Sequence, residues 1–363
     1  MKTYFYIFSF VGFVCACSEP YDFKIKLNVD AIVVDGLITD KPETYRIKIH
    51  KASDYGNTSY IPVQNANVSV SEDSGAEYIF LEDPGIPGDY ISNISDFTGK
   101  PGHTYTLKIH TLDGYDYKSS PQLLLPIQRI DSVYGEKAFE YNVNIDASGN
   151  YISYKADGIA VFLDIRNNND GNQNYRFMNS LYVQYTYQIP VMFSPFMYGW
   201  KKYTAAIPGD GMYLSNNAAG MSMNEIKKLN FTFIPFDKSF YNIQFLWQGV
   251  DITSMGRFTL LVKQYRMNEE TSGYYTQIDK QMKAEGKLFD PITTQLNGNI
   301  TCQTDPNKQA FGFFEASAKM SYVYTDESYN WVQYPVFRLR EINLDNIPES
   351  GETAVSPPYF WIF

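Results

Sequence analysis

Two of the three cysteines in this chain of 363 residues, Cys15 and Cys17, stand one residue apart. A C-x-C pair can belong to a metal site, because thiolates are good zinc ligands. One other cysteine, Cys302, is present, so the sequence cannot supply a four-cysteine site or a disulfide framework. The pair must therefore be explained by its surroundings.

The first 16 residues have the composition of a secretory signal peptide. Lys2 is followed by an uncharged apolar run that ends in small residues at Ala16. This run is too short to cross a bilayer as a helix, which needs roughly 20 apolar residues. We therefore expect residues 1–16 to be removed.

Val14-Cys15-Ala16-Cys17 resembles the lipobox of bacterial lipoproteins. That resemblance implies cleavage before Cys17, acylation of its thiol and amine, and a lipidated tether over residues 17–30. Val14 is a poor residue for the cut before Cys15, so Cys17 is the predicted anchor. Two or more acyl chains hold a protein stably on a membrane. The alternative is an ordinary secretory peptide with incidental cysteines.

The histidines and a polar turn offer weak candidates for metal ligands. His50 and His110 end similar strands and could lie on one outer face, but no third ligand follows from the spacing. Residues 167–174 resemble a calcium loop, but Arg166 and Phe177 occupy positions where ligands are needed. We predict no metal and no cofactor.

Catalytic motifs are not evident in the sequence. It contains no nucleophile elbow, no H-E-x-x-H and no phosphate loop. Forty acidic residues leave a hydrolase with an unlocated acid pair as the weakest alternative. The net charge of −10, without a basic patch, argues against nucleic acid as a partner.

An aromatic segment between Pro190 and Trp200 is the most distinctive stretch outside the regular patterns. Its prolines disfavour a central strand and predict a loop. Exposed apolar loops mark partner sites, whereas a loop folded back would cover the core. The possible partner-binding residues are Met192, Phe193, Phe196, Met197, Tyr198 and Trp200.

The elements that must position these residues are mainly strands. Short alternating segments such as 44–50 and 104–110, separated by Gly- and Pro-rich turns, predict an antiparallel β-sandwich over residues 31–125. We expect it to be immunoglobulin-like or transthyretin-like. In residues 44–50, Tyr45, Ile47 and Ile49 should face the core.

A second β-rich domain with one or more helices is predicted over residues 126–363. Asp170-Gly171 favours a hairpin turn between two long strands. Residues 257–266 read as a strand, and 268–286 as the best helix. Residues 311–325 predict a late strand pair or one bent strand.

The order of several segments resembles a lipoprotein family of Bacteroidota, domain of unknown function 4249. The segments are AIVVDGLITD, TYRIKI, VQNANVSVSEDSG, GKPGHTYTLKI, IDSVY, NGNITCQTDP, AFGFFEAS and PPYFW. Members of that family are typically encoded beside TonB-dependent receptors, and no catalytic residues are attached to it. Many members carry cysteines near the C-terminal end, and the tail ESGETAVSPPYFWIF has none.

The resemblance implies a non-enzymatic accessory protein, anchored in the outer membrane by the lipid on Cys17 and working with a TonB-dependent receptor or another barrel protein. The alternative is a surface module that captures glycan or peptide for uptake. Glu19 and Asp22, just after the anchor, favour the cell surface over the periplasmic face. Asp131-Ser132-Val133 resembles an O-glycosylation sequon of the same phylum, with Ser132 as acceptor, or it simply opens a strand.

Overall fold

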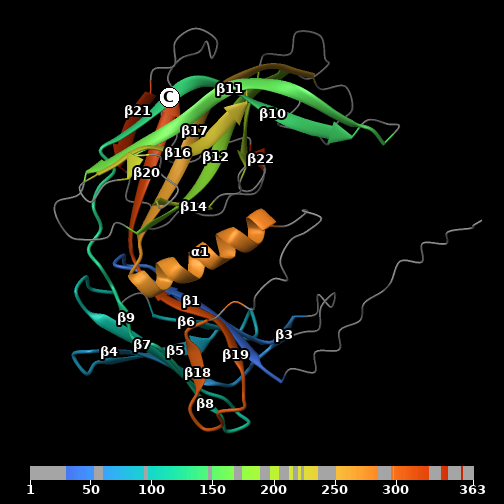
Figure 1. The fold of residues 1–363 in the computed structure, drawn as a ribbon. Coiled ribbons are helices and arrows are strands. Elements are labelled where there is room, and N and C mark those ends of the chain that lie inside the picture. Colours follow the sequence, from blue (N-terminus) through green and yellow to red (C-terminus); the bar gives the residue numbers. More distant parts are fainter. Residues whose placement is uncertain are drawn as a thin grey trace, which may run out of the picture.

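The computed structural model contains two β-rich bodies with one helix between them (Figure 1). It describes residues 30–52, 60–93, 97–145, 149–166, 174–188, 197–203, 212–215, 220–221, 225–235, 251–284, 296, 298–326, 337–341 and 353–354. Cys15 and Cys17 lie outside the described residues, so the lipid anchor stays a prediction.

The first body is a sheet folded over on itself. Its strand order is β18-β8-β7-β4-β5-β6-β2-β1-β19, and β3 pairs with β2 and β9 with β7. Its strands are β1 (Ile32–Ile38), β2 (Arg46–Lys51), β3 (Ile61–Pro62), β4 (Asn67–Glu72), β5 (Glu77–Glu82), β6 (Asp89–Ile91), β7 (Thr104–His110), β8 (Asp116–Ser119), β9 (Gln122–Leu123), β18 (Ile300–Cys302) and β19 (Ala310–Ala316). We call this body the first sandwich.

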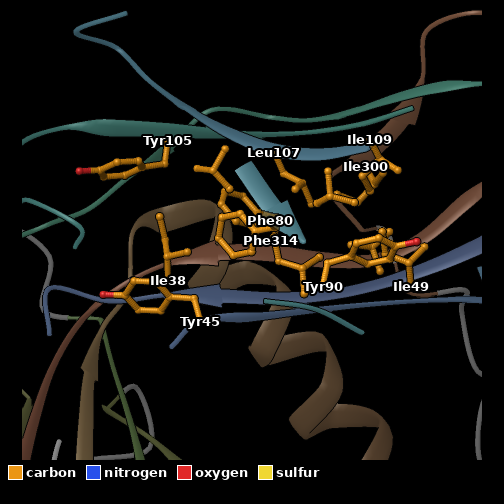
Figure 2. Close-up of a cluster of buried hydrophobic side chains, with 14 of the residues drawn as sticks. Ile38, Tyr45, Ile49, Phe80, Tyr90, Tyr105, Leu107, Ile109, Ile300 and Phe314 are labelled. Atoms are coloured by element: carbon orange, nitrogen blue, oxygen red, sulfur yellow. The ribbon is translucent and has the colours of Figure 1, made fainter. Parts of the chain in front are cut away.

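The first sandwich encloses a core rich in tyrosine and isoleucine (Figure 2). Tyr45, Ile47 and Ile49 are buried in it, as the alternation of residues 44–50 predicts. Because side chains alternate along a strand, Lys48 points outward and is exposed. The periodicity of two therefore selects the inward face correctly in this part of the chain.

Residues 126–363, the predicted second domain, do not all lie in the second body. β18 pairs with β8, and β19 pairs with β1 over its full length, so two strands from beyond residue 298 complete the first sandwich. The β1–β19 pair is also parallel, whereas the sequence favoured a purely antiparallel sandwich. Local patterns identify strands but carry no information on such distant partners.

Gly312 lets β19 approach β1 closely. It has a φ of +87°, a conformation that other residues rarely adopt. A Cβ at this position would lie 1.9 Å from the carbonyl oxygen of Val34, so no larger residue fits.

The second body is built from two further sheets. The first contains β10 (Ser132–Ile145), β11 (Tyr151–Arg166), β15 (Gly220–Met221) and β16 (Glu225–Pro235). The other contains β12 (Tyr175–Gln188), β13 (Met197–Tyr203), β14 (Met212–Leu214), β17 (Asp251–Arg266), β20 (Ala318–Asp326), β21 (Phe337–Glu341) and β22 (Thr353–Ala354).

These two sheets share one apolar core, so the second body is also a sandwich. Val161 and Leu163 of β11 enter this core from one sheet, and Phe177 of β12 and Leu260 of β17 enter it from the other. The mainly β fold with a helix is therefore confirmed. The long strands around residues 151–188 and 257–266 match the predicted ones.

Asp170 and Gly171 lie outside the described residues, but the strands on either side of them do not form the predicted hairpin. β11 pairs with β10 and β16, whereas β12 pairs with β13, β14 and β17, so the two strands belong to different sheets. Turn chemistry alone does not distinguish such a crossover from a hairpin.

The predicted helix is present as α1 (Glu269–Ala284) and lies between the two sandwiches (Figure 1). Asn268 caps it, because its side-chain oxygen accepts a hydrogen bond from the N–H of Thr271 at 2.9 Å. Glu269 and Glu270 complement the positive end of the helix dipole.

Candidate functional site

A buried ion pair joins the two sandwiches next to α1. Nη2 of Arg176, on β12, donates to both carboxylate oxygens of Glu315, on β19, at 3.0 and 2.8 Å. The guanidinium also packs against the rings of Tyr265 and Tyr275, 4.4 and 4.2 Å from their centroids. Tyr275, on α1, donates its hydroxyl to Glu315 at 2.8 Å. Both sandwiches and the helix therefore meet at one charge pair.

The surroundings of this ion pair explain the raised pKa values of Arg176 and Tyr275. Burial, the largest single effect, disfavours the charged guanidinium, but Glu315, Tyr275 and Tyr265 together outweigh burial and raise the pKa of Arg176. Burial and Glu315 also raise the pKa of Tyr275. The side chains of Arg176 and Glu315 are only 6% and 2% exposed, so no ligand can reach them without opening the joint. We assign the cluster a structural role.

Gln122 makes a second contact between the first sandwich and the helix. Its amide nitrogen donates to Glu270 at 2.7 Å, and its oxygen accepts from Asn268 at 2.8 Å and Thr271 at 3.1 Å. Gln122 is fully buried, so these hydrogen bonds satisfy a polar group that would otherwise be costly to bury. The start of α1 is thereby fixed against β9.

An open groove of about 810 Å³ lies on the first sandwich beside β5. Ile79 and Leu81 line it and are 70% and 69% exposed. Its other lining residues are Glu77, Tyr78, Glu82, Pro84, Ile91, Ser92, Asn93 and Phe97. Two large aliphatic side chains this exposed in one groove are typical of a contact surface.

The groove exists because β5 and β6 diverge. The two strands pair only through Leu81 with Ile91 and Glu82 with Tyr90. Beyond this point Ser92 follows β2 instead, since its N–H donates to the carbonyl of Tyr45 at 3.0 Å. At Ser92 the chain has thus left β5 and stays beside Tyr45, which directly precedes β2.

Residues 77–80 of β5 consequently form a free strand edge. They pair with β4 on one side, and no strand of the described chain pairs with them on the other. In an antiparallel ladder, alternate residues direct their N–H and C=O groups to each side. The edge beside the groove therefore offers main-chain donors and acceptors.

Charged groups stand at both ends of the groove. Glu77 accepts a hydrogen bond from Lys108 at 3.0 Å, which holds the pKa of that carboxyl below its usual value. Glu82 accepts from the N–H groups of Asn65 and Gly88 at 2.8 and 3.0 Å. Phe97, which also lines the groove, is buried and packs against Tyr78. The groove is therefore apolar along its length and acidic at its ends.

The aromatic segment 190–200 is not a single loop. Met197, Tyr198 and Trp200 belong to strand β13, and Trp200 is only 5% exposed. The prolines that argued against a strand end at residue 195, before β13 begins. Met192, Phe193 and Phe196 lie outside the described residues. Trp200 is therefore a core residue of the second sandwich rather than an exposed contact.

Ser132 opens β10, as the plainer of the two interpretations predicts. Its hydroxyl is half-buried and donates to Asp164 at 3.1 Å. O-glycosylation at Ser132 would require this hydrogen bond to break.

His50 and His110 are not brought together. They lie on β2 and β7, which β4, β5 and β6 separate in the sheet. His110 instead contacts Asp116 at 2.7 Å.

The groove residues Ile79 and Leu81 were not singled out from the sequence. The segment EYIFLE reads as a strand, but its central run YIFL is apolar at four successive positions. An ordinary half-exposed strand would alternate, so this run was the available signal that both faces of β5 are apolar.

Fold and groove together define a β-rich protein of two sandwiches with an open, largely apolar groove on the first. Residues 18–322 match the family model described as Domain of unknown function (DUF4249). The chain belongs to this family, as the resemblance in sequence indicated. No curated protein and no solved structure matches the chain. In the described part of the chain, no helix has the length and apolar character needed to cross a membrane.

Proposed function

We propose that this chain is a non-enzymatic lipoprotein, held on the outer membrane by a lipid on Cys17, that binds an outer-membrane barrel protein such as a TonB-dependent receptor. The resemblance to a Bacteroidota lipoprotein family supports the anchor and the kind of partner. The groove beside β5 is the observation that supports a binding role.

An extended strand of the partner is the occupant that this groove fits best. The free edge at residues 77–80 can hydrogen-bond to an added strand, as in β-strand addition. Ile79 and Leu81 then supply apolar contacts for alternate side chains of that strand. Burying each contributes about 1.5–3 kcal/mol before the costs of association.

Recovery of the partner from membranes tests the binding role. The tagged chain is isolated in mild detergent, and co-purifying barrel proteins are quantified. We expect a stoichiometric barrel partner with the wild-type chain and little of it with Leu81→Lys, which places a charge in the apolar groove. Leu112→Lys is the matched control, because Leu112 is 79% exposed in the turn between β7 and β8, away from the groove.

Three results would count against the proposal. Absence of any stoichiometric barrel protein would remove the accessory role. Equal recovery with Leu81→Lys and Leu112→Lys would show that the groove is not the contact site. A glycan or free peptide bound by the isolated chain would favour the capture of ligands for uptake.

The anchor is tested separately by fractionation. Cys17→Ala should release the protein from membranes, since acyl chains are its proposed attachment. Cys15→Ala is the control and should leave the protein in the membrane fraction. Retention of Cys17→Ala with normal processing would refute the lipid on Cys17.

A further inference from the structure

Three side chains with metal-binding atoms converge at one end of the first sandwich. Glu72 ends β4, Asp73 follows it, and His103 directly precedes β7. Nδ1 of His103 lies 2.9 Å from Oε1 of Glu72 and 2.8 Å from Oδ1 of Asp73. All three candidate ligand atoms lie within 4.8 Å of one another.

The backbone around these residues is fixed by the sheet. The N–H of Asp73 donates to the carbonyl of Thr104 at 3.0 Å, and the N–H of Thr104 donates to Oδ2 of Asp73 at 3.1 Å. Tyr78 donates its hydroxyl to Oε2 of Glu72 at 2.8 Å. Each carboxylate is thus oriented through one oxygen, and its other oxygen faces His103. Such outer hydrogen bonds typically orient metal ligands.

Glu72 supplies an independent indication that this cluster can accept a cation. Its side chain is only 1% exposed, and its Oε1 accepts no hydrogen bond, although His103 lies close. Lys100 is 3.5 Å away and 59% exposed, so it compensates this charge weakly. A buried carboxylate oxygen without a donor is costly, and a bound cation removes that cost.

We propose that Glu72, Asp73 and His103 bind a divalent transition-metal ion of the zinc type. One imidazole nitrogen and two carboxylate oxygens suit zinc better than calcium or magnesium, which prefer oxygen alone. Zinc–ligand bonds of about 2.0–2.2 Å place tetrahedral ligand atoms about 3.3–3.6 Å apart. Nδ1 of His103 lies 2.9 and 2.8 Å from the carboxylate oxygens of Glu72 and Asp73, so each of these pairs must separate by about 0.4–0.8 Å. Asp73 and His103 are partly exposed and able to move.

The site has three protein ligands and an open side. Asp73 and His103 are 47% and 39% exposed, so water or a donor atom from another molecule can complete the coordination. Tyr78 lines the groove and also orients Glu72, which places the ion next to the groove. The metal proposal nevertheless rests on its own residues and does not depend on the proposed function.

Zinc titration of the full chain tests the proposal directly. The protein is purified in mild detergent without a polyhistidine tag, stripped with a chelator and titrated with ZnCl2 by calorimetry at neutral pH. We expect one ion per chain. His103→Ala should weaken binding by more than about 100-fold, because loss of a ligand exceeds the 10–100-fold cost of losing an outer partner. Tyr78→Phe should weaken it by about 10–100-fold.

His110→Ala is the matched control. His110 also pairs through Nδ1 with one exposed aspartate, Asp116, at 2.7 Å, but it lies outside the convergent cluster. Its replacement should leave zinc affinity unchanged.

The proposal fails if the wild-type chain takes up no zinc, or if His103→Ala binds it as tightly as the wild type. In the second case Cys302 is the first alternative to examine, since it is the free thiol among the described residues. Melting curves verify that His103→Ala is folded. Should it not fold, Asp73→Asn, at a half-exposed position, replaces it with the same expected loss.

Discussion

Replacing Glu315 by leucine removes the carboxylate that pairs with Arg176 where the two sandwiches and α1 meet. The guanidinium then stays in a site where its side chain is only 6% exposed, without the two hydrogen bonds that it donates to Glu315. Breaking a buried ion pair in this way costs about 3–5 kcal/mol. Tyr275 also loses an acceptor, worth about 1 kcal/mol.

The two tyrosines beside Arg176 do not change this loss. Tyr265 and Tyr275 contact the guanidinium in both the wild type and the variant, so these contacts cancel in the difference. We therefore expect Glu315→Leu to lower the free energy of unfolding by about 4 kcal/mol. Urea denaturation followed by circular dichroism measures this quantity.

An exposed ion pair serves as the control, because it shows what removing a glutamate costs when its partner is not left buried. Lys228 contacts Glu136 at 2.8 Å, but both side chains are about half exposed. Glu136→Leu should therefore cost no more than about 1 kcal/mol. The double variant Arg176→Met with Glu315→Leu should recover most of the lost stability, because it removes the stranded charge as well. Equal costs for Glu315→Leu and Glu136→Leu, or no recovery in the double variant, would refute the reasoning.

Two further predictions concern β19 and the buried tyrosines. Gly312→Ala should cost several kcal/mol more than Gly114→Ala, as measured by urea denaturation. Both glycines have a φ of +87°, but only at Gly312 does an added Cβ strike the backbone of β1; equal losses would contradict the close approach. Burial raises the pKa of Tyr265 to about 12 from an unfolded value near 10. The folded state therefore holds the phenolic proton of Tyr265 more tightly than the unfolded state does. This difference contributes to the free energy of unfolding in full below about pH 10, and the contribution is lost as the pH rises to about 12. Urea denaturation between pH 10 and 12 measures the free energy of unfolding. We expect this free energy to fall by about 1.4 kcal/mol less per pH unit in Tyr265→Phe than in the wild type. The same pH dependence in both proteins would contradict this prediction.

Sequence patterns predicted the elements that depend on nearby residues. The inward face of residues 44–50 follows from alternation, and α1 follows from its acidic start and apolar spacing. The interior of β17 was likewise recognised from its apolar run. Each of these depends on residues within a few positions of one another, where periodicity is informative.

The partners of these elements could not be predicted in the same way. Arg176 and Glu315 are separated by 139 residues and resemble surface charges in sequence. Glu72, Asp73 and His103 likewise converge only because β4 and β7 are neighbours in the sheet. The groove arises where β6 leaves β5, and that divergence depends on Tyr45 and Ser92 meeting across 47 residues.

The pairing of β1 with β19 also determines when the first sandwich can form. Asp30 and Lys308, at the entrances to these two strands, contact each other across 278 residues of chain. Contacts this distant in sequence close slowly, because loop-closure entropy must be overcome before they form. Until residue 316 has been synthesised, β1 has β2 on one side and an open edge on the other. The residues that begin the fold therefore reach their final pairing late, and an unprotected strand edge persists during most of the synthesis of the chain.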